Sequence, residues 1–294
     1  MQKWIPQVIT ILGVTLALSA LPPVAKAQLS QTVQVQSQPS INNTTAPEAN
    51  SQLSNQPDLA LLAKTVANFV KSERYQTESE LQLTAKSSGT TVTVPVQIKT
   101  LAQSPQQFRS EITFGTPGSS DRRQYIVVSN GKQVWIYRPD LKQYAVSDYA
   151  SFNKSNDSFL IGMSSSLFLE MAPEFASMKG QGSNSEQNIR EALVEMLSSE
   201  EAAIKGGVRT LEGRDYYVYE YTDPKKEYTI NALVAPEQAT VEQIQMITQS
   251  EDVDVVINEK ILRRVENPVI ASDTFNFSPP QGAKQVKSIS LEAF

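Results

Sequence analysis

Residues 123–146 read RQYIVVSNGKQVWIYRPDLKQYAV and decide the fold of this chain. Two β-rich runs, residues 124–129 and 132–137, flank Asn130-Gly131. Asn-Gly between alternating runs of this kind predicts a β-hairpin with a type I′ turn, in which both central residues have positive φ. Pro139 ends the second run because it fixes φ and lacks a backbone N–H, and residues 143–146 can return as a third strand. The stretch predicts an antiparallel meander with no evident catalytic group; its aromatic residues include Trp135, Tyr137 and Tyr144.

The composition of the 294 residues removes several classes of function. There is no His and no Cys, which excludes Ser–His and Cys–His nucleophilic catalysis, His and Cys ligands for zinc, disulfides and a lipidated N-terminal Cys. The net charge is −5 at pH 7, so no basic surface suggests nucleic acid. We therefore expect no cofactor, no metal, no catalytic residue and no nucleic-acid partner.

The N-terminus has the layout of an export signal. Lys3 precedes an apolar run at residues 8–21, and Ala25-Lys26-Ala27 matches an A-x-A cleavage site. An uncleaved anchor is the alternative, but the run is shorter than the ~20 residues that a membrane-spanning helix needs. Residues 28–57 are rich in Gln, Ser, Asn, Thr and Pro and too polar to bury a core, which predicts a disordered linker. The expected organisation is a signal peptide at 1–27, this linker, and one domain at 58–294.

Period-two alternation predicts strands before the meander. Phe108, Ser110, Ile112 and Phe114 fall on one face of such a strand. Pro95 interrupts an earlier run and favours an edge or a bulge there, since Pro cannot donate to a neighbouring strand. The strands expected in this part of the chain cover residues 81–83, 92–98 and 108–114.

Apolar residues recur at helical spacing in three places. Asp58 is a candidate N-cap for a helix that runs to about residue 71. Asp157 is a candidate cap for a helix over 158–171, with Pro173 beyond its end. Ser185 can begin a third helix.

Gly206-Gly207 is expected to end that third helix, and strands follow it. The strands expected in the C-terminal third cover residues 217–221, 228–234, 241–248, 253–257 and 260–265. One curved, mainly antiparallel sheet wrapped around helices fits this order of elements best, an α+β fold.

Three short motifs resemble those of one family. Residues 128–139, VSNGKQVWIYRP, resemble the signature V-S-D-G-K-x-L-W-x-Y-x-P of the periplasmic outer-membrane lipoprotein carrier (LolA-like) superfamily. Residues 275–282, FNFSPPQG, are similar to its closing F-x-F-x-P-P-x-G, and residues 104–109, SPQQFR, resemble its R-P-N-x-F-x strand. The order and spacing of the motifs agree with the family over residues 58–287.

The resemblance implies an incomplete β-barrel, a half-pipe of about 11 strands, with helices as a lid over an apolar cavity that binds acyl chains in the carriers. Phe108 falls at a family position that faces this cavity, and the helix around residues 159–163 resembles the lid. The carriers have Arg before the Pro of the R-P-N motif, a residue tied to handing lipoprotein onward, whereas this chain has Ser104. Lipoprotein transfer itself is therefore left open.

The first functional hypothesis is a periplasmic binding or carrier protein for an acylated or otherwise apolar ligand, a lipid or a lipoprotein. The residues expected to contact that ligand are Phe108, Ile112, Phe114, Trp135, Leu160, Met163 and Leu167. The same side chains could instead fill a closed core. We expect a monomer, with inner- and outer-membrane proteins as candidate partners.

Two other functions stay open. The chain could be a non-carrier sensor or protein-interaction module of the cell envelope on the same fold. A hydrolase is the third hypothesis, because paired carboxyl groups can act without His. Nothing in the sequence pairs the available acids, which are Glu111, Asp121, Asp140, Glu170 and Glu174.

Overall fold

A single open sheet of twelve strands forms the frame of the protein. The computed structural model describes residues 53–87, 90–116, 118–119, 122–155, 157–179, 187–191, 194, 204–222, 228–249 and 253–289. The predicted signal peptide and the linker up to residue 52 lie outside these ranges. The strands are β1 (Arg74–Ser87), β2 (Thr90–Gln103), β3 (Gln107–Phe114), β4 (Arg123–Asn130), β5 (Gln133–Arg138), β6 (Gln143–Asp148), β7 (Ile204–Leu211), β8 (Arg214–Thr222), β9 (Tyr228–Ala235), β10 (Thr240–Gln249), β11 (Asp254–Glu266) and β12 (Lys284–Gln285).

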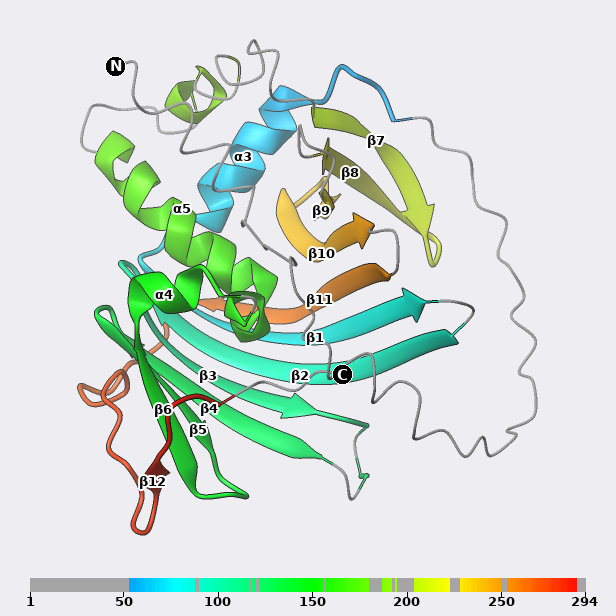
Figure 1. The fold of residues 1–294 in the computed structure, drawn as a ribbon. Coiled ribbons are helices and arrows are strands. Elements are labelled where there is room, and N and C mark those ends of the chain that lie inside the picture. The colour runs from blue at the N-terminus through cyan, green and yellow to red at the C-terminus, as the bar shows by residue number, and fades with distance from the viewer. Residues whose placement is uncertain are drawn as a thin grey trace.

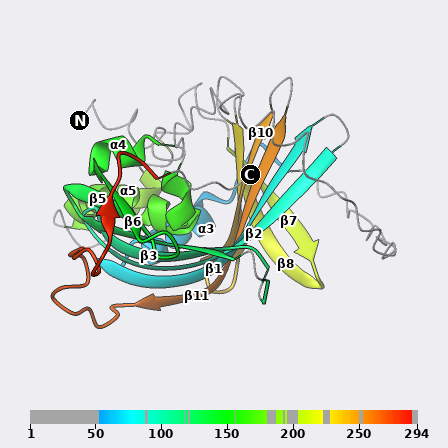
Figure 2. The ribbon, with the colours of Figure 1, turned by 60° about the horizontal axis from the view of Figure 1, so that its bottom comes forward.

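The strand order across the sheet is β12-β6-β5-β4-β3-β2-β1-β11-β10-β9-β8-β7. Two antiparallel meanders, β1 to β6 and β7 to β11, are joined where β1 pairs with β11. The two-residue strand β12 is parallel to β6. Because β12 and β7 lie at opposite ends of the sheet, the barrel is not closed, and the sheet curves around the helices (Figures 1 and 2). The predicted incomplete barrel is confirmed, with twelve strands instead of about eleven.

The helices lie on the concave side of the sheet (Figure 1). They are α3 (Leu59–Phe69), α4 (Tyr149–Asn153), a 3₁₀ turn (Ser158–Ile161) and α5 (Met163–Lys179). Asp58 caps α3 as predicted, because its Oδ1 accepts a hydrogen bond of 2.9 Å from Leu61 N. Residues 187–191 are helical as well, but Ser185 and most of the third predicted helix lie outside the described residues. None of the helices in the described ranges combines the length and apolar character required to span a membrane.

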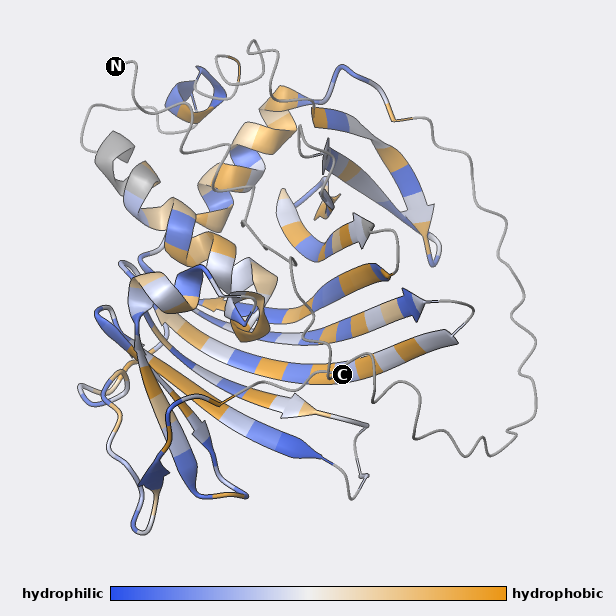
Figure 3. Cartoon of the chain, viewed as in Figure 1, coloured by the Kyte–Doolittle hydropathy of each residue, from blue (hydrophilic) through white to orange (hydrophobic). Residues whose placement is uncertain are grey.

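Strand alternation separates the two faces of the sheet. Along β3, the side chains of Phe108, Ser110, Ile112 and Phe114 are all buried, as the alternation predicted. Figure 3 shows the same alternation of apolar and polar residues along the neighbouring strands. The buried side chains on the concave side form one core with the helices. Burial of each methylene stabilises the packing of the helices on the sheet by about 0.8 kcal/mol.

The turn between β4 and β5 differs from the predicted type I′ turn. Gly131 has positive φ (90°), but Asn130 does not. The Asn130 side chain instead accepts hydrogen bonds from Lys132 N at 3.0 Å and Gln133 N at 2.9 Å. This side-chain turn satisfies the two N–H groups without a left-handed Asn. The last residues paired across the hairpin are Ser129 and Val134.

The helix predicted over 158–171 has different bounds. Gly162, with φ of 95°, separates the 3₁₀ turn from α5, and the Asp157 side chain makes no capping hydrogen bond. Pro173 lies inside α5 and not beyond its end. The helix continues past the missing Pro N–H because Ala172 and Phe175 are buried in the core.

Two further boundaries in the C-terminal half were predicted wrongly. Gly206 and Gly207 lie inside β7, where a Cβ on Gly206 would come within 2.7 Å of the Tyr217 hydroxyl oxygen. A side chain does not fit there, so the glycine marks a close approach within a strand. Residues 254–266 form one strand, β11, instead of two. Asn258 does not turn the chain, because its Oδ1 accepts a 2.6 Å hydrogen bond from Gln243 on β10.

Pro95 lies inside the sheet but at a local edge. The Pro95 carbonyl accepts a 2.9 Å hydrogen bond from Gly115 N. In an antiparallel pair the nitrogen and the carbonyl of one residue point to the same side, so the Pro95 nitrogen, which carries no hydrogen, also points toward β3. The ladder between β2 and β3 begins only at Val96, opposite Phe114. Since β3 has ended at this point, no ladder bond is lost.

Candidate ligand-binding site

A small pocket lies where the lid, defined here as the 3₁₀ turn and α5, meets β9 and β10. The space in it that the centre of a water molecule could occupy is only about 20 Å³, which is room for about one water. Its lining is mainly apolar and comes from both sides: Ser158, Phe159, Met163, Ser166, Leu167, Glu170, Ile230, Ile244 and Met246. A longer ligand therefore requires α5 to move away from the sheet.

The predicted contact residues fall into three groups. Met163 and Leu167 line the pocket, and buried Leu160 follows Phe159 in the 3₁₀ turn. A second group, from β3, lies in the same core but outside the pocket lining; it comprises Phe108, Ile112 and Phe114. Phe108 packs on Phe152 of α4 with ring centroids 5.7 Å apart, whereas Phe114 packs on Tyr125 of β4 at 5.5 Å.

Trp135 forms the third group alone, on the opposite face of β5. Its neighbours Val134 and Ile136 are buried in the core. The Trp135 ring stacks on Phe277 at 6.1 Å, and Phe277 also contacts the rings of Tyr137 and Tyr144 at 5.9 and 5.6 Å. The aromatic residues of the meander thus hold the C-terminal segment on the outside of the sheet. Trp135 does not share a face with the pocket.

A buried carboxylate, which the sequence analysis missed, holds the start of α5. Glu259 of β11 has no exposed surface. Its Oε2 accepts from Ser164 N and its Oε1 from Ser164 Oγ, both at 2.8 Å. Burial raises the pKa of Glu259, while hydrogen bonds from Ser164, Ser79 and Met163 N oppose that shift. The first N–H groups of a helix have no partner inside it. Glu259, on β11, accepts a hydrogen bond from one of them and so takes the role that an N-cap side chain normally has for α5.

Gly162 makes this contact possible. Its φ is 95°, a conformation that favours glycine, and a Cβ there would lie 3.0 Å from Glu259 Oε1. One residue earlier, the Ile161 carbonyl accepts a 2.6 Å hydrogen bond from Thr100 of β2. We call Glu259, Ser164 and Gly162 the latch, because they join the lid to β11 on the concave side of the sheet.

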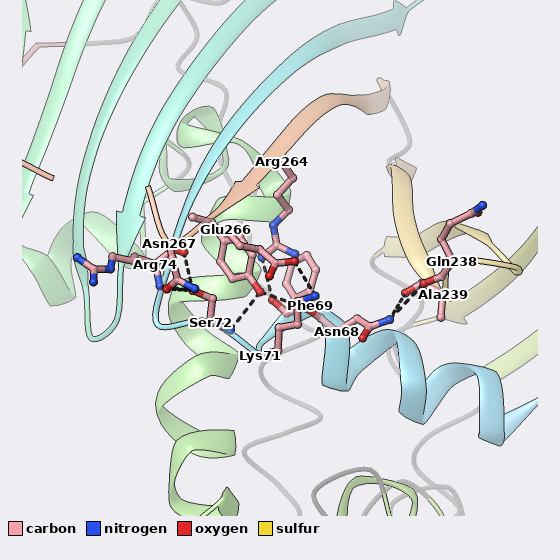
Figure 4. A network of polar contacts seen from close by, with 11 residues as sticks. Asn68, Phe69, Lys71, Ser72, Arg74, Gln238, Ala239, Arg264, Glu266 and Asn267 are labelled. Atoms are coloured by element: carbon pink, nitrogen blue, oxygen red, sulfur yellow. Dashed lines mark hydrogen bonds and ion pairs between the residues drawn. The ribbon is translucent and has the colours of Figure 1, made fainter. Parts of the chain in front are cut away.

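Arg264 of β11 lies among three aromatic rings. Its guanidinium carbon is 3.9 Å from the ring centroid of Phe69, 3.6 Å from that of Tyr75 and 5.7 Å from that of Phe168 on α5. Its Nη2 also donates to the Phe69 carbonyl at 2.9 Å (Figure 4). Burial lowers the pKa of Arg264 to about 10, so the group stays charged at neutral pH. We call these four side chains the arginine cage.

A bulge in β11 aims Arg264 into the cage. Glu78 of β1 pairs with Arg263, but the next residue, Ser79, pairs with Ile261, so Leu262 is the extra residue. Before the bulge, odd-numbered residues such as Glu259 face inward; after it, the even-numbered Arg264 does. Without the bulge the guanidinium would point to solvent.

The C-terminal end of α3 is tied to the sheet on both sides of the cage (Figure 4). Asn68 donates to the carbonyls of Gln238 and Ala239 in the β9–β10 turn, at 3.2 and 3.3 Å. On the other side, Lys71 pairs with Glu266 at 2.8 Å. These contacts tie the end of α3 to the β9–β10 turn and to β11, and the latch ties the start of α5 to β11.

Two half-buried carboxyl groups lie in or next to the lid, Asp157 immediately before the 3₁₀ turn and Glu170 on α5. Burial raises the pKa of Asp157 to about 6. It raises the pKa of Glu170 to about 6 as well, against a hydrogen bond of 3.2 Å from Asn153 Nδ2 to Oε1. Both carboxyl groups are more acidic in the unfolded chain, so ionisation costs stability in the folded protein as pH rises from about 4 to about 6.

Replacing Asp157 by Asn is expected to stabilise the protein at pH 7.5 by about 2 kcal/mol. The effect should be small at pH 4, where the Asp157 carboxyl is neutral in the folded protein and only about half ionised in the unfolded chain. Urea unfolding of both proteins at the two pH values measures the difference. Asp273→Asn, in an exposed loop, is the control and should show no such pH dependence. Equal destabilisation by Asp157→Asn at both pH values would contradict the buried, unfavourable charge.

No group of three or more acids, within the ranges that the structure describes, is arranged to hold a metal ion. Glu170 is also the sole acid among the described residues that line the pocket. Of the other acids considered for a hydrolase, Asp121 and the side chain of Glu174 lie outside the description.

No protein-family model matches this chain, and no curated protein matches it either. Solved structures do. A LolA superfamily protein from Nitrosomonas europaea is 9% identical, with a TM-score of 0.30 and coverage of 74% of this chain and 97% of that one.

Two other similar structures extend the comparison. A putative outer membrane lipoprotein-sorting protein domain from Vibrio parahaemolyticus is 12% identical, with a TM-score of 0.33 and coverage of 74% of this chain and 97% of that one. An uncharacterized conserved protein from Thermus thermophilus is 11% identical, with a TM-score of 0.39 and coverage of 77% and 99%. At these identities, function has to be inferred from the residues of this chain.

Proposed function

We propose that the protein is a binding or carrier protein of the cell envelope for an acylated or otherwise apolar ligand, a lipid or a lipoprotein. The observation that carries this proposal is the apolar pocket between α5 and β9–β10. It has a Met on each wall, Met163 on α5 and Met246 on β10, and unbranched Met side chains adapt to ligands of different shape. The ligand would enter by displacing α5 from β9 and β10.

The free energy gained by burying the ligand is partly offset by the cost of moving α5 away from the sheet. Burying one methylene contributes about 0.8 kcal/mol, so a twelve-carbon chain contributes roughly 10 kcal/mol before the costs of association. Opening the pocket exposes the apolar side of α5, which offsets part of that gain. A lid that repacks on the sheet when the ligand leaves makes release feasible, as a carrier requires. Phe108, Ile112 and Phe114 would then form a deeper wall along β3, with Phe108 under α4, and Trp135 would have no part in binding.

The first test is native mass spectrometry of the exported protein, purified without detergent, with analysis of its organic extract. We expect one acylated species per chain, or uptake of one fluorescent fatty-acyl probe. Ile244→Trp, which fills the pocket from β10, should weaken probe binding about 5- to 150-fold, since overpacking costs about 1–3 kcal/mol.

Trp135→Phe is the matched control for that variant, because it alters an aromatic residue on the opposite face of the sheet. It should bind the probe like the parent protein. A folded, ligand-free protein that takes up no apolar ligand, whatever the charge of its head group, would contradict the proposal.

An envelope interaction module is the alternative, and one observation favours it. β7 is the last strand at its end of the sheet, and among the described residues only Ser54 pairs with its outer side, through hydrogen bonds of 2.8 and 2.9 Å with Gly206. The next outward-facing backbone groups, at Val208 and Thr210, could accept an extended peptide. A partner complex that forms equally well without any apolar ligand would support this alternative over the carrier.

A further inference from the structure

The polar part of the pocket consists of hydrogen-bond acceptors. The Ser158 hydroxyl donates to the Ser155 carbonyl at 3.0 Å, and the Ser166 hydroxyl donates to the Ser158 carbonyl at 2.8 Å. Each hydroxyl hydrogen is therefore in use inside the lid, and only the oxygen lone pairs remain for a ligand. The third polar side chain of the lining is the carboxylate of Glu170.

Glu170 has room for a ligand on one of its two oxygens. Asn153 Nδ2 donates to Oε1 at 3.2 Å, and no other hydrogen bond or ion pair reaches the carboxylate from the described residues. With a pKa of about 6, the group is ionised at neutral pH. Burial, assisted by the charge of Glu170, raises the pKa of Tyr149, so this neighbour stays neutral and brings no second charge.

Glu170 also moves with the apolar wall of the lid. Met163, Leu167 and Glu170 are spaced four and three residues apart, so they share one face of α5. When α5 leaves the sheet, the carboxylate and the apolar side chains stay together. Any amphiphile bound to this face meets a negative charge beside its chain.

We propose that the pocket selects an amphiphile whose polar end is a cation with N–H donors, a primary ammonium above all, and that Glu170 selects it. This inference rests on the proposed function and names its ligand class. A carboxylate head group would face Glu170 with like charge and would find no donor on Ser158 or Ser166. An ammonium head group supplies the donors that all three acceptors lack and pairs with the charge.

The test is a series of ligands with one tail and different head groups, measured by isothermal titration calorimetry at pH 7.5 below micelle formation. The members are dodecylammonium, dodecyltrimethylammonium, dodecanol and dodecanoate. Dodecylammonium is expected to bind at least tenfold more tightly than dodecanoate, with the trimethyl compound, which has no donor, between them. Methylammonium, which lacks the tail, should not bind detectably.

Glu170→Gln should bring dodecylammonium and dodecanoate to within about threefold of each other, because the charge is gone while the volume is kept. Glu111→Gln, an exposed acid on the outer face of β3, is the matched control and should keep the full preference. Equal affinity across the series, or a preference that survives in Glu170→Gln, would overturn the inference and leave the carrier function standing. If no member of the series binds, the proposed function fails and this inference fails with it.

Discussion

Replacing Glu259 by Ala is expected to lower the free energy of unfolding by about 3 kcal/mol. The variant leaves Ser164 N and the Ser164 hydroxyl without an acceptor in a fully buried place, and each such donor costs about 1–3 kcal/mol. The carboxylate that is lost was itself costly to bury, so the net effect is smaller than the sum for all its donors. Urea unfolding measures this change.

The loss should also be concentrated in the lid. Hydrogen exchange is expected to speed up first in residues 163–168, before the strands β3 and β4 lose protection. Ser164→Ala keeps the carboxylate and removes one bond, so about 1 kcal/mol is expected and the variant remains testable if Glu259→Ala does not fold. Glu80→Ala, an exposed acid on the adjacent strand, should stay within about 0.5 kcal/mol of the parent. If Glu259→Ala behaves like Glu80→Ala, the latch does not hold the lid.

Replacing Arg264 by Ala is expected to cost a similar amount, about 3 kcal/mol. The guanidinium contacts three rings, and a desolvated cation–π contact contributes about 2 kcal/mol. The variant also loses the charged hydrogen bond to the Phe69 carbonyl and the packing of the Arg264 stem. Thermal and urea unfolding check the size of the effect.

Arg263→Ala is the matched control, because Arg263 is adjacent in β11 but exposed on the other face. It should change stability by less than about 0.5 kcal/mol. Arg264→Lys distinguishes charge from shape: a Lys keeps the charge but cannot lie flat between the rings, so only part of the loss should be recovered. Full recovery by Lys, or equal effects at positions 263 and 264, would argue against the cage.

The sequence was informative where one local signal decided the structure. Asp58 before an apolar helical stripe gave α3, and the alternation through Phe108 and Ile112 gave the buried face of β3. Each of these signals needs only a few neighbouring residues and a solvent-exposed opposite face. For the same reason the meander around Asn130-Gly131 was predicted correctly in its strands, although its turn type depends on a side-chain hydrogen bond.

The face of Trp135 could not be read from β5 alone. Val134 and Ile136 are apolar on one side, and Trp135 and Tyr137 are apolar on the other, so alternation does not say which side is concave. The choice is made by Phe277, which comes from the far end of the chain and covers the aromatic side.

The latch was missed because its residues look like a turn. The polar pair Asn258-Glu259 predicts a break between two strands. In the structure Glu259 lies on the same inward face of β11 as Val255 and Ile257. The sequence did contain one signal: an acid stands where the alternation of the strand predicts an apolar residue. A buried acid needs hydrogen-bond donors of its own. Ser164 at the start of α5 supplies two of them, and Ser79 and Met163 N supply the others. The bulge at Leu262 has no comparable local signal, because it depends on pairing with β1.

The pairing of β1 with β11 also sets the order in which the sheet can be assembled. β1 follows the first helix, but its second partner lies near the end of the chain, with register contacts such as Leu81 to Glu259. A chain that emerges N-terminus first can fold β1 to β6 early and must leave the other edge of β1 unpaired until β11 has arrived. An unpaired edge of this length readily joins other chains. Chains truncated before residue 254 are therefore expected to aggregate, because the last third of the intact chain supplies β11, the strand that pairs with this edge of β1.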